Sequence, residues 1–490
     1  MDHVATAPPG RFTRTQRVTL AVVCTATAML MLDIAVVNTA LPAIAREFGA
    51  GMSALKWVVD GYTLALAAVV LTAGAWADRS GRRLVFVIGA VVFTVASGVC
   101  AAAGDMTLLN AARVVQGLGA ALLFATSLAL LAHAFPGRAE RATSLAAYGA
   151  TIGGAFAIGP LLGGILTQWL DWRAIFLINV PVGLAMLAAT RWVAESRSTA
   201  PRRGDWAGQV TAIIALAALT YGFFEAAEKG WTDPRTFWTF AVAAVALGLF
   251  VLVERVVEQP MLPLGMFANP SFAGAQVATF AISASMFAVF VYVTLYLQGV
   301  LGLSPIGAGL IYLPGTAVMF VVAGVTGSLI GRIPAWWMIA GGLVAVAAGL
   351  AVMTVAAVGG SGWAMAPGFI LSSVGAGVFN PVMSGVVLAE SRDDDAGLAA
   401  GINDVFRQAG IALGVAALGA VFPARSVLAG GSPTEFVDAL NTALWIGAAV
   451  ALAGALAAAL TMRKARAADS APAESEQPAH AAVPASTLAP

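Results

Sequence analysis

Long apolar stretches alternate with short polar ones along this chain from Val18 to Met462. Each stretch has about 20 residues, the length that an α-helix with a rise of about 1.5 Å per residue needs to cross roughly 30 Å of hydrocarbon. The pattern predicts an all-α polytopic membrane protein with fourteen transmembrane helices. The expected spans are Val18–Ile44, Ser53–Ala77, Leu84–Ala103, Thr107–Ala132, Thr143–Gln168, Ala174–Ala194, Ala207–Glu225, Phe237–Val257, Ser271–Gln298, Ala308–Ile330, Trp337–Val358, Trp363–Ala389, Leu398–Phe422 and Leu440–Met462.

The polar interruptions suggest how the helices are grouped. The longest interruption, from Glu195 to Trp206, follows the sixth span, and a loop with Gly74 and Arg79 after the second span is echoed by Gly331 and Arg332 after the tenth. Such internal repeats are common in transporters, which bind their substrates at the repeat interface. We therefore expect a six-helix bundle in residues 1–198, two inserted helices in 199–262, a second six-helix bundle in 263–462 and a disordered cytoplasmic tail in 463–490.

Composition supports a membrane protein and narrows its chemistry. The chain is 60% hydrophobic and 10% charged, more apolar than a soluble protein of 490 residues could bury. Its Lys and Arg residues gather on the side of the two ends of the chain, which predicts that both termini are cytoplasmic. The two cysteines lie in apolar spans and the three histidines are scattered, so we expect no disulfide framework, metal site or cofactor.

Three charged residues lie inside expected spans at similar depth. Asp33 lies in the first span, Asp60 in the second and Arg113 in the fourth. Burial favours the neutral form of an acid, whereas a nearby arginine favours the charged form, so a cavity that alternates between wet and dry could make such an acid release and rebind a proton. We expect these three residues to couple transport to protons. A static Asp33–Arg113 pair that pins two helices remains the alternative, as does a position for Asp60 in an external vestibule.

A charged loop joins the second and third spans with the sequence G-A-W-A-D-R-S-G-R-R. Its acid can accept hydrogen bonds from basic side chains or helix N-termini, and its arginines can reach carbonyls and acids at neighbouring helix ends. We interpret it as a conformational latch, although a simple positive-inside anchor would have the same charge. The latch residues are Gly74, Asp78, Arg79, Gly81, Arg82 and Arg83.

Small residues recur through the fifth span and in part of the fourth. Spacing of four residues allows close helix packing, and a proline inside a helix permits a kink. The fifth span carries Gly149, Gly153, Gly159, Pro160, Gly163 and Gly164, which we expect to form a tight seal or hinge as well as a packing face. Gly117 and Gly119 in the fourth span do not indicate a nucleotide site, because neither a preceding strand nor a P-loop lysine accompanies them.

These motifs together resemble the fourteen-helix drug:proton antiporter family of the major facilitator superfamily. The resemblance rests on L-D-I-A-V-V-N-T-A-L-P at Leu32–Pro42, the loop at Gly74–Arg83, R-x-x-Q-G-x-G from Arg113 through Gln116 and Gly117 to Gly119, the glycine motif of the fifth span, W-R-A-I-F-L-I-N-V-P at Trp172–Pro181, and second-half motifs at Tyr296–Pro314 and Gly397–Gln408. It covers about residues 16–462. The second copy of the loop motif, near Gly331–Pro334, lacks the acid and most of the basic residues.

The resemblance implies export of amphiphilic drugs or antibiotics across a bacterial cytoplasmic membrane, by alternating access and in exchange for protons. An exporter dedicated to one metabolite or antibiotic made by the same cell is the alternative. A membrane enzyme would need a convergent catalytic set, which the sequence does not offer, and a scaffold would not need Asp33 and Arg113 in the bilayer. We expect a monomer that acts on small amphiphilic substrates, with no nucleic-acid partner.

Overall fold

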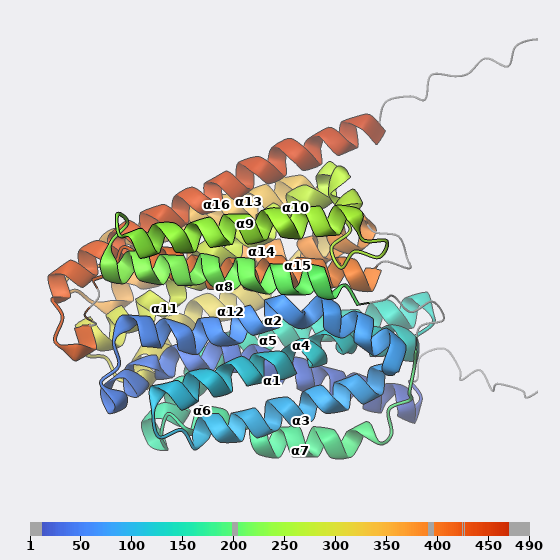
Figure 1. The fold of residues 1–490 in the computed structure, drawn as a ribbon, viewed down its shortest axis with the longest axis horizontal. Helices are drawn as coiled ribbons and strands as arrows, with labels where there is room; N and C mark the ends of the chain where they lie inside the picture. Colours follow the sequence, from blue (N-terminus) through green and yellow to red (C-terminus); the bar gives the residue numbers. More distant parts are fainter. Residues whose placement is uncertain (1–11, 198–203, 391–395, 424, 426, 470–490) are drawn as a thin grey trace, which may run out of the picture.

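The computed structural model describes residues 12–197, 204–390, 396–423, 425 and 427–469, and long helices fill most of them (Figure 1). The helices of the first part are α1 (Arg14–Phe48), α2 (Met52–Ser80), α3 (Arg82–Ala101), α4 (Met106–Ala134), α5 (Arg138–Trp169), α6 (Ala174–Leu177), α7 (Asn179–Thr190), α8 (Trp206–Lys229) and α9 (Pro234–Val256). Those of the second part are α10 (Pro270–Ile282), α11 (Ala288–Leu295), α12 (Pro305–Leu329), α13 (Ala335–Val352), α14 (Ala366–Ala389), α15 (Ala396–Gly419) and α16 (Pro433–Asp469).

The helical segments have the length and polarity of membrane spans. Within the described residues, 12 helices are long and apolar enough to cross a bilayer, and Ala174–Thr190 forms a shorter apolar segment. The 24-residue helix α15, which carries the buried residue Asp404, packs between these helices but is not one of the 12. The structure confirms the expected all-α multi-pass fold, while the count of fourteen spans stays a prediction.

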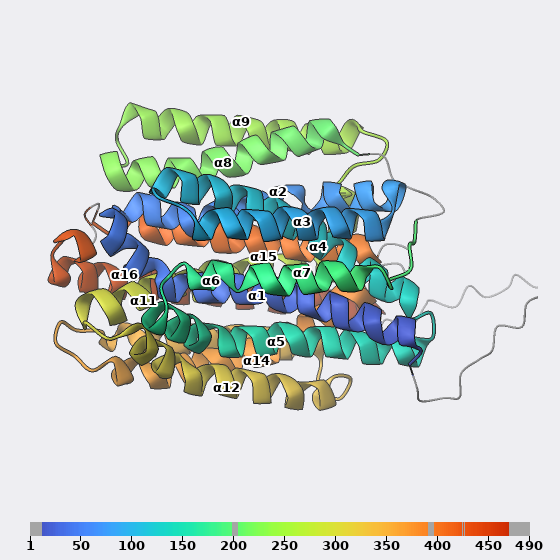
Figure 2. The same cartoon turned by 90° about the horizontal axis from the view of Figure 1, so that it is seen from below.

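The helices pack as two bundles with a helical hairpin on the outside. In the first bundle α4 packs against α2 and α3, and α5 packs against α1; in the second, α13 packs against α14 and α16. The bundles meet where α2 contacts α15 and where α5 contacts α12. The pair α8–α9 lies against the outer side of α2 and α15 (Figure 2). Because α1 starts and α16 stops at the same end of the molecule, we call this the terminal end and the other the far end (Figure 1).

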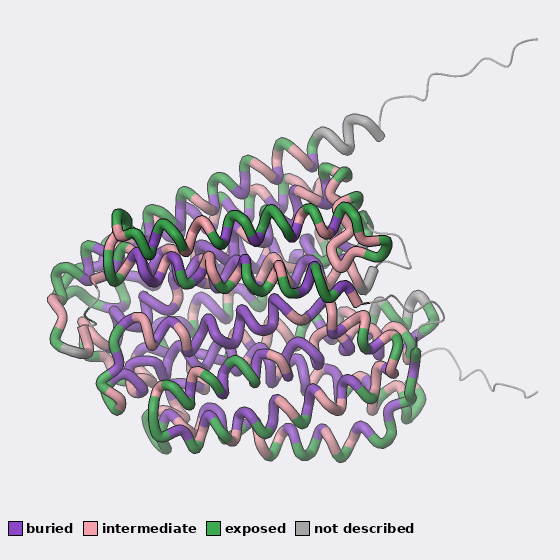
Figure 3. The backbone as a smooth tube through the Cα atoms, in the orientation of Figure 1, coloured by how far each residue is buried: buried purple, intermediate pink, exposed green. Residues whose placement is uncertain are grey.

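Burial distinguishes the centre of the bundle from its surface. The backbone is mostly buried along α1 and α2 and largely exposed along α9 (Figure 3). On α9 large apolar side chains point outward, with Trp238 66% and Val245 63% exposed. Exposed apolar side chains at this density suit lipid rather than water. The interior, by contrast, contains buried charged residues, which form the site described below.

Two features differ from the sequence expectation. Helix α16 continues to Asp469, so residues 463–469, which the sequence predicts to belong to a disordered tail, are helical. The rest of the expected tail lies outside the described residues. The expected span Ser271–Gln298 contains two π-helical segments, Ser283–Phe287 and Tyr296–Val300, which have no sequence signature but often occur at functional sites.

Candidate functional site

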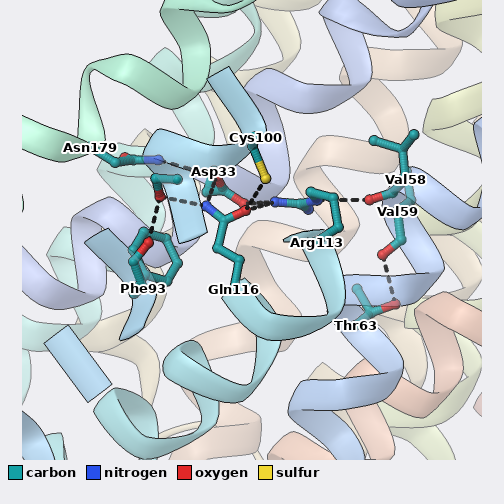
Figure 4. Close-up of polar contacts among 10 residues, drawn as sticks. Asp33, Val58, Val59, Thr63, Phe93, Cys100, Arg113, Gln116 and Asn179 are labelled. Atoms are coloured by element: carbon teal, nitrogen blue, oxygen red, sulfur yellow. Dashed lines mark hydrogen bonds and ion pairs between the residues drawn. The ribbon is translucent and has the colours of Figure 1, made fainter. Parts of the chain in front are cut away.

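Asp33 lies in the buried middle of α1 and has two partners on α4. Its Oδ2 atom lies 2.5 Å from Nη1 of Arg113, and its Oδ1 atom accepts a hydrogen bond of 2.8 Å from Nε2 of Gln116 (Figure 4). Asp33 and Arg113 are each 1% exposed. Charges removed from water are stable only when they are paired and hydrogen-bonded, and this pair meets both conditions. The structure therefore brings Asp33 and Arg113 together as the sequence predicted.

Arg113 is held by more than the carboxylate. Its Nε atom donates to the carbonyl oxygen of Val58 on α2 at 2.8 Å, and its Nη1 atom also donates to Oε1 of Gln116 at 2.7 Å. The guanidinium lies 4.4 Å from the centre of the Tyr62 ring. A planar group with several fixed donors suits this combination of contacts better than an ammonium would. Arg113 thus links α1, α2 and α4 at one point.

Sequence reasoning missed two residues of this network. Asn179 at the start of α7 donates to Oδ1 of Asp33 at 3.2 Å, and Ser97 on α3 accepts a hydrogen bond of 2.9 Å from Nε2 of Gln116. Asn179 stands inside the Trp172–Pro181 motif, which was the available signal. With these two contacts, side chains from four other helices surround or support the Asp33 carboxylate.

Asp60 lies on α2 between Val58 and Tyr62, which both contact Arg113, but its carboxylate stands outside the hydrogen-bond network of Asp33. It is 0% exposed, and neither of its carboxylate oxygens has a hydrogen-bond partner among the described residues. One helical turn earlier, Lys56 is 2% exposed and donates to the carbonyl oxygen of Gly419, the last residue of α15, at 2.8 Å. Asp60 therefore lies one helical turn from a contact between the two bundles, and among the described residues no hydrogen bond or ion pair joins it to Arg113.

The glycines of α4 explain how Arg113 and Gln116 reach the centre. A side chain at Gly117 would collide with the backbone of Tyr62 on α2 and lie 3.0 Å from Cβ of Ala65. At Gly119 it would lie 2.6 Å from the backbone nitrogen of Phe93 on α3. Both glycines therefore serve close packing of α4 between its two neighbours, and this packing fixes the depth and direction of the arginine.

The glycine motif of α5 divides into two tight faces and one open end. A Cβ atom at Gly159 would collide with Ala35 of α1, and one at Gly163 would lie 2.9 Å from Cα of Val36. Gly164 faces the other bundle, where the same atom would lie 2.5 Å from the carbonyl oxygen of Pro305.

The close approach also extends to the proline of α5. A Cβ atom at Gly309 of α12 would lie 2.9 Å from the carbonyl oxygen of Pro160. Close packing does not extend to the first glycines of the motif, because nothing lies within 4 Å of a Cβ at Gly149 and only Phe320, at 3.9 Å, near one at Gly153.

The expected latch lies at the terminal end and is closed within its own bundle. Asp78 forms an ion pair of 2.9 Å with Arg82, and Arg83 donates through Nη1 to the carbonyl oxygen of Val193 at 3.2 Å. Glu195, which sequence reasoning missed, accepts from the backbone nitrogens of Arg83 and Leu84 at 3.0 and 3.2 Å and so caps α3.

Not every residue of the loop motif takes part in these contacts. Gly81 has a φ of 121°, and a Cβ there would lie 2.9 Å from the Glu195 carboxylate, so this position requires glycine. Gly74 has nothing within 4 Å of a Cβ, and Arg79 is exposed.

A small cavity lies between the two bundles beside the Asp33 network. Its volume is about 40 Å³, enough for a few water molecules at most. Polar contributions come from Asn38, Thr316 and Ser373. The apolar lining consists of Ile34, Ala35, Val59, Phe156, Pro160, Met286, Phe287, Phe290, Val291, Met319, Phe369 and Ile411. Asn38 lies on α1 little more than one turn from Asp33, so one helix borders both the ion pair and the cavity.

Comparison with known proteins decides the family. The family model described as Major Facilitator Superfamily matches residues 23–415. The chain belongs to the major facilitator superfamily. Its multi-pass helical fold and the cavity between two bundles are therefore those of a membrane transporter family.

Relatives within the superfamily carry drug-related names. The chain is 36% identical over 412 residues to "Multidrug resistance protein Stp" of Mycobacterium tuberculosis, covering 84% of this chain and 76% of that protein. It is 34% identical over 418 residues to "Tetracenomycin C resistance and export protein" of Streptomyces glaucescens, covering 83% and 76%. A solved structure of the peptide transporter POT in complex with sulfate has a TM-score of 0.65 at 14% identity, covering 91% of this chain and 94% of that one, which shows the shared fold.

In this superfamily member the predicted site residues fall into four groups. Asp33, Arg113 and Gln116 form one network in the first bundle, whereas Asp60 lies with Lys56 near the far end. The latch residues and the glycines of α5 occupy separate positions at the terminal end and at the interface with α1 and α12. Their roles in transport stay predictions.

Proposed function

We propose that this protein exports amphiphilic drugs or antibiotics across the bacterial cytoplasmic membrane in exchange for protons. The observation that carries the proposal is the buried Asp33–Arg113 pair directly beside a cavity shared by the two bundles. The names of the relatives support a role in drug resistance and export. The proton gradient supplies the energy, and we expect neither a cofactor nor catalysis.

Protonation of Asp33 would change the forces within the network. The carboxylate attracts the Arg113 guanidinium and accepts hydrogen bonds from Gln116 and Asn179. A proton on this carboxyl removes its charge and turns one acceptor into a donor, so the contacts with Arg113 weaken and α1 can shift against α4. Loss of the proton to the cytoplasm restores the pair. Each cycle would thus move a proton inward while α1 changes position at the cavity.

Export by alternating access requires the two bundles to separate. Drug-sized ligands occupy sites of about 300–1,000 Å³, far more than the about 40 Å³ of the present cavity. Near the far end Lys56 bonds to Gly419, and Nε2 of Gln298 donates to the carbonyl oxygen of Thr39 at 2.9 Å, in each case joining one bundle to the other. These bonds would break when the cavity opens on that side.

Charge distribution supports an orientation with both termini in the cytoplasm. Arg14, Arg17, Arg82, Arg83 and Arg463 all lie at the terminal end. Cytoplasmic loops of membrane proteins carry such an excess of basic residues. The far end would then face outward, and the latch would face the cytoplasm. We expect the monomer to be the functional unit.

A narrower function is the alternative. The relative from Streptomyces glaucescens is named for a single antibiotic, which favours an exporter dedicated to one compound made by the same cell. Both functions would use the same ion pair and the same cavity, and they differ only in substrate range.

Transport into everted membrane vesicles tests the proposal. A panel of drugs and antibiotics is presented with and without an imposed pH gradient, using wild-type protein and Asp33→Asn. The proposal expects gradient-dependent uptake of several amphiphilic compounds by the wild type and of none by the variant. Uptake of one compound alone would select the dedicated exporter, and uptake that ignores the gradient would contradict proton exchange.

A further inference from the structure

We propose that the substrates of this exporter are flat, uncharged aromatic molecules with a hydrogen-bond donor, bound between the bundles by Asn38, Ser373 and the surrounding phenylalanines. The inference rests on the proposed export function and specifies the chemical class that the site accepts. It follows from the charge, the unpartnered polar atoms and the aromatic rings of the cavity.

The first step concerns charge. Among the described residues, the cavity lining contains no acidic or basic side chain. Asp33 lies next to the cavity but is paired with Arg113, and Asp60, which follows Val59, does not line it. A cation moved into an apolar site needs a partner of opposite charge, because its desolvation is otherwise uncompensated. The site therefore favours molecules that are neutral when bound.

The second step concerns hydrogen bonding. Ser373 on α14 is 0% exposed, and within the described part of the chain neither its hydroxyl nor Oδ1 of Asn38 on α1 has a hydrogen-bond partner. Thr316, the third polar residue of the lining, already donates to the carbonyl oxygen of Leu313 at 3.1 Å. A buried polar atom without a partner is unfavourable, so a ligand that satisfies it gains affinity and specificity. One of these groups comes from each bundle, which suits a single ligand held between them.

The third step concerns shape. Phe156 of the first bundle and Phe287 of the second lie with ring centres 5.4 Å apart and planes tilted by 47°. On the other side of the cavity Phe290 contacts Phe369, with ring centres 5.4 Å apart at 62°. Because the Phe156–Phe287 contact joins the two bundles, their separation would open it into a slot with aromatic walls. A flat ring system can replace the lost contact by stacking between them.

A matched set of tricyclic probes separates these requirements. Phenanthridinone is flat and neutral and carries one N–H donor; 5-methylphenanthridinone lacks the donor; N-methylphenanthridinium is similar in shape but carries a fixed positive charge. Binding to purified full-length protein in nanodiscs is measured without a proton gradient. We expect phenanthridinone to bind at least about tenfold more tightly than either other probe, the effect of one good hydrogen bond or one uncompensated charge.

Variants then locate the site. Ser373→Ala should weaken phenanthridinone binding about tenfold and leave 5-methylphenanthridinone unchanged. Ser384→Ala removes a hydroxyl from the same helix at an exposed position, where it bonds only to the carbonyl oxygen of Asn380, and should change neither probe. Asn38→Asp, nearly identical in shape, should raise the affinity for N-methylphenanthridinium relative to that for phenanthridinone.

The results that overturn the inference are distinct from those that overturn export. Equal or tighter binding of the cation to the wild type, absence of phenanthridinone binding, or an Asn38→Asp variant with unchanged preference would each contradict it. None of these measurements depends on a gradient or on transport. If the protein shows the expected binding preference but transports nothing in vesicles, the proposed binding site stands and the proposed export function is wrong.

Discussion

At the scale of single residues, Asp33 is a carboxylate whose two oxygens are both held by hydrogen bonds. Its two oxygens contact Arg113, Gln116 and Asn179, all within the first bundle. A buried carboxylate with this many donors is anchored while it is charged and released once it is neutral. The same contacts would also suit a static ion pair, so experiments must separate titration from packing.

The Asp33→Asn variant makes this separation. Asparagine keeps the size and can still accept from Gln116, but it cannot titrate. Substrate-induced proton release from proteoliposomes should fall to the level of protein-free liposomes, while the protein still folds. Asp105→Asn is the control, because Asp105 is an exposed N-cap of α4 and asparagine caps a helix equally well. Proton release at the wild-type level in Asp33→Asn would show that the pair is static.

Arg113→Lys tests whether the planar shape of the arginine is needed. Lysine keeps the charge but cannot donate at once to Val58, Asp33 and Gln116. The acceptors left without donors should lower the free energy of unfolding by about 1–3 kcal/mol, and transport should fall with it. Thermal unfolding in detergent and vesicle transport measure the two effects. Arg46→Lys, at the exposed end of α1, should behave as the wild type, and wild-type stability in Arg113→Lys would argue against the multiple contacts.

At the scale of elements, α5 shows how one helix can serve two interfaces. Gly159 and Gly163, four residues apart, lie on the face toward α1, and Gly164 lies on the face toward α12. The helix therefore contacts a neighbour of its own bundle and one of the opposite bundle without large side chains between them. Movement of one bundle against the other must pass through the second of these contacts.

A pair of alanine variants on α5 tests the close approach to α1. Gly163→Ala would place a methyl group against Val36 and Thr39 and should destabilise the protein by about 1–3 kcal/mol, as overpacking does. Gly149→Ala makes the same change where nothing lies within 4 Å and should be neutral or slightly stabilising. Unfolding curves and passive proton leak are compared for both variants. Equal stability of the two would mean that α1 and α5 are not closely packed.

Prediction from sequence works best for the helices, and its limits are also clear at this scale. Lipid requires long apolar helices, so hydropathy was enough to find most spans. A charge in such a span must find a partner, which made Asp33–Arg113 predictable. Depth along a helix follows from sequence, but rotation about its axis does not. Asp60 has a similar depth to Asp33, yet among the described residues its carboxylate has no hydrogen-bond partner. The distant residues Asn179 and Glu195 had no local pattern that marked their partners.

At the scale of the whole molecule, the bundles are joined by bonds near the far end. Lys56 of α2 contributes a charged donor to the last carbonyl group of α15, where the helix dipole places partial negative charge. The ammonium is almost fully buried and also lies 5.6 Å from the ring centre of Phe224 on α8. This contact joins both bundles and the outer hairpin.

Lys56→Met should shift the molecule toward opening at the far end. It removes a hydrogen bond from a charged donor, and such a bond contributes about 1.5–3 kcal/mol. Spin labels at Leu170→Cys and Val358→Cys, exposed positions near the far end of each bundle, report the distance between bundles. The distribution should gain a longer component, whereas Lys229→Met, which breaks an ion pair within α8, should not change it. An unchanged distribution in Lys56→Met would exclude this residue from closure.

The position of Asp33 on α1 has a consequence for how such a protein can evolve. Between Asp33 and Asn38, α1 provides the carboxylate of the ion pair, the contact surface for α5 at Ala35 and Val36, and the amide that borders the cavity. We expect a substitution in this stretch to disturb the ion pair, the helix packing and the cavity together. The second bundle contributes Met286, Phe287, Phe290, Met319 and Phe369 to the cavity and nothing to the ion pair. New resistance profiles should therefore arise through changes on the second bundle, with the first inherited almost intact.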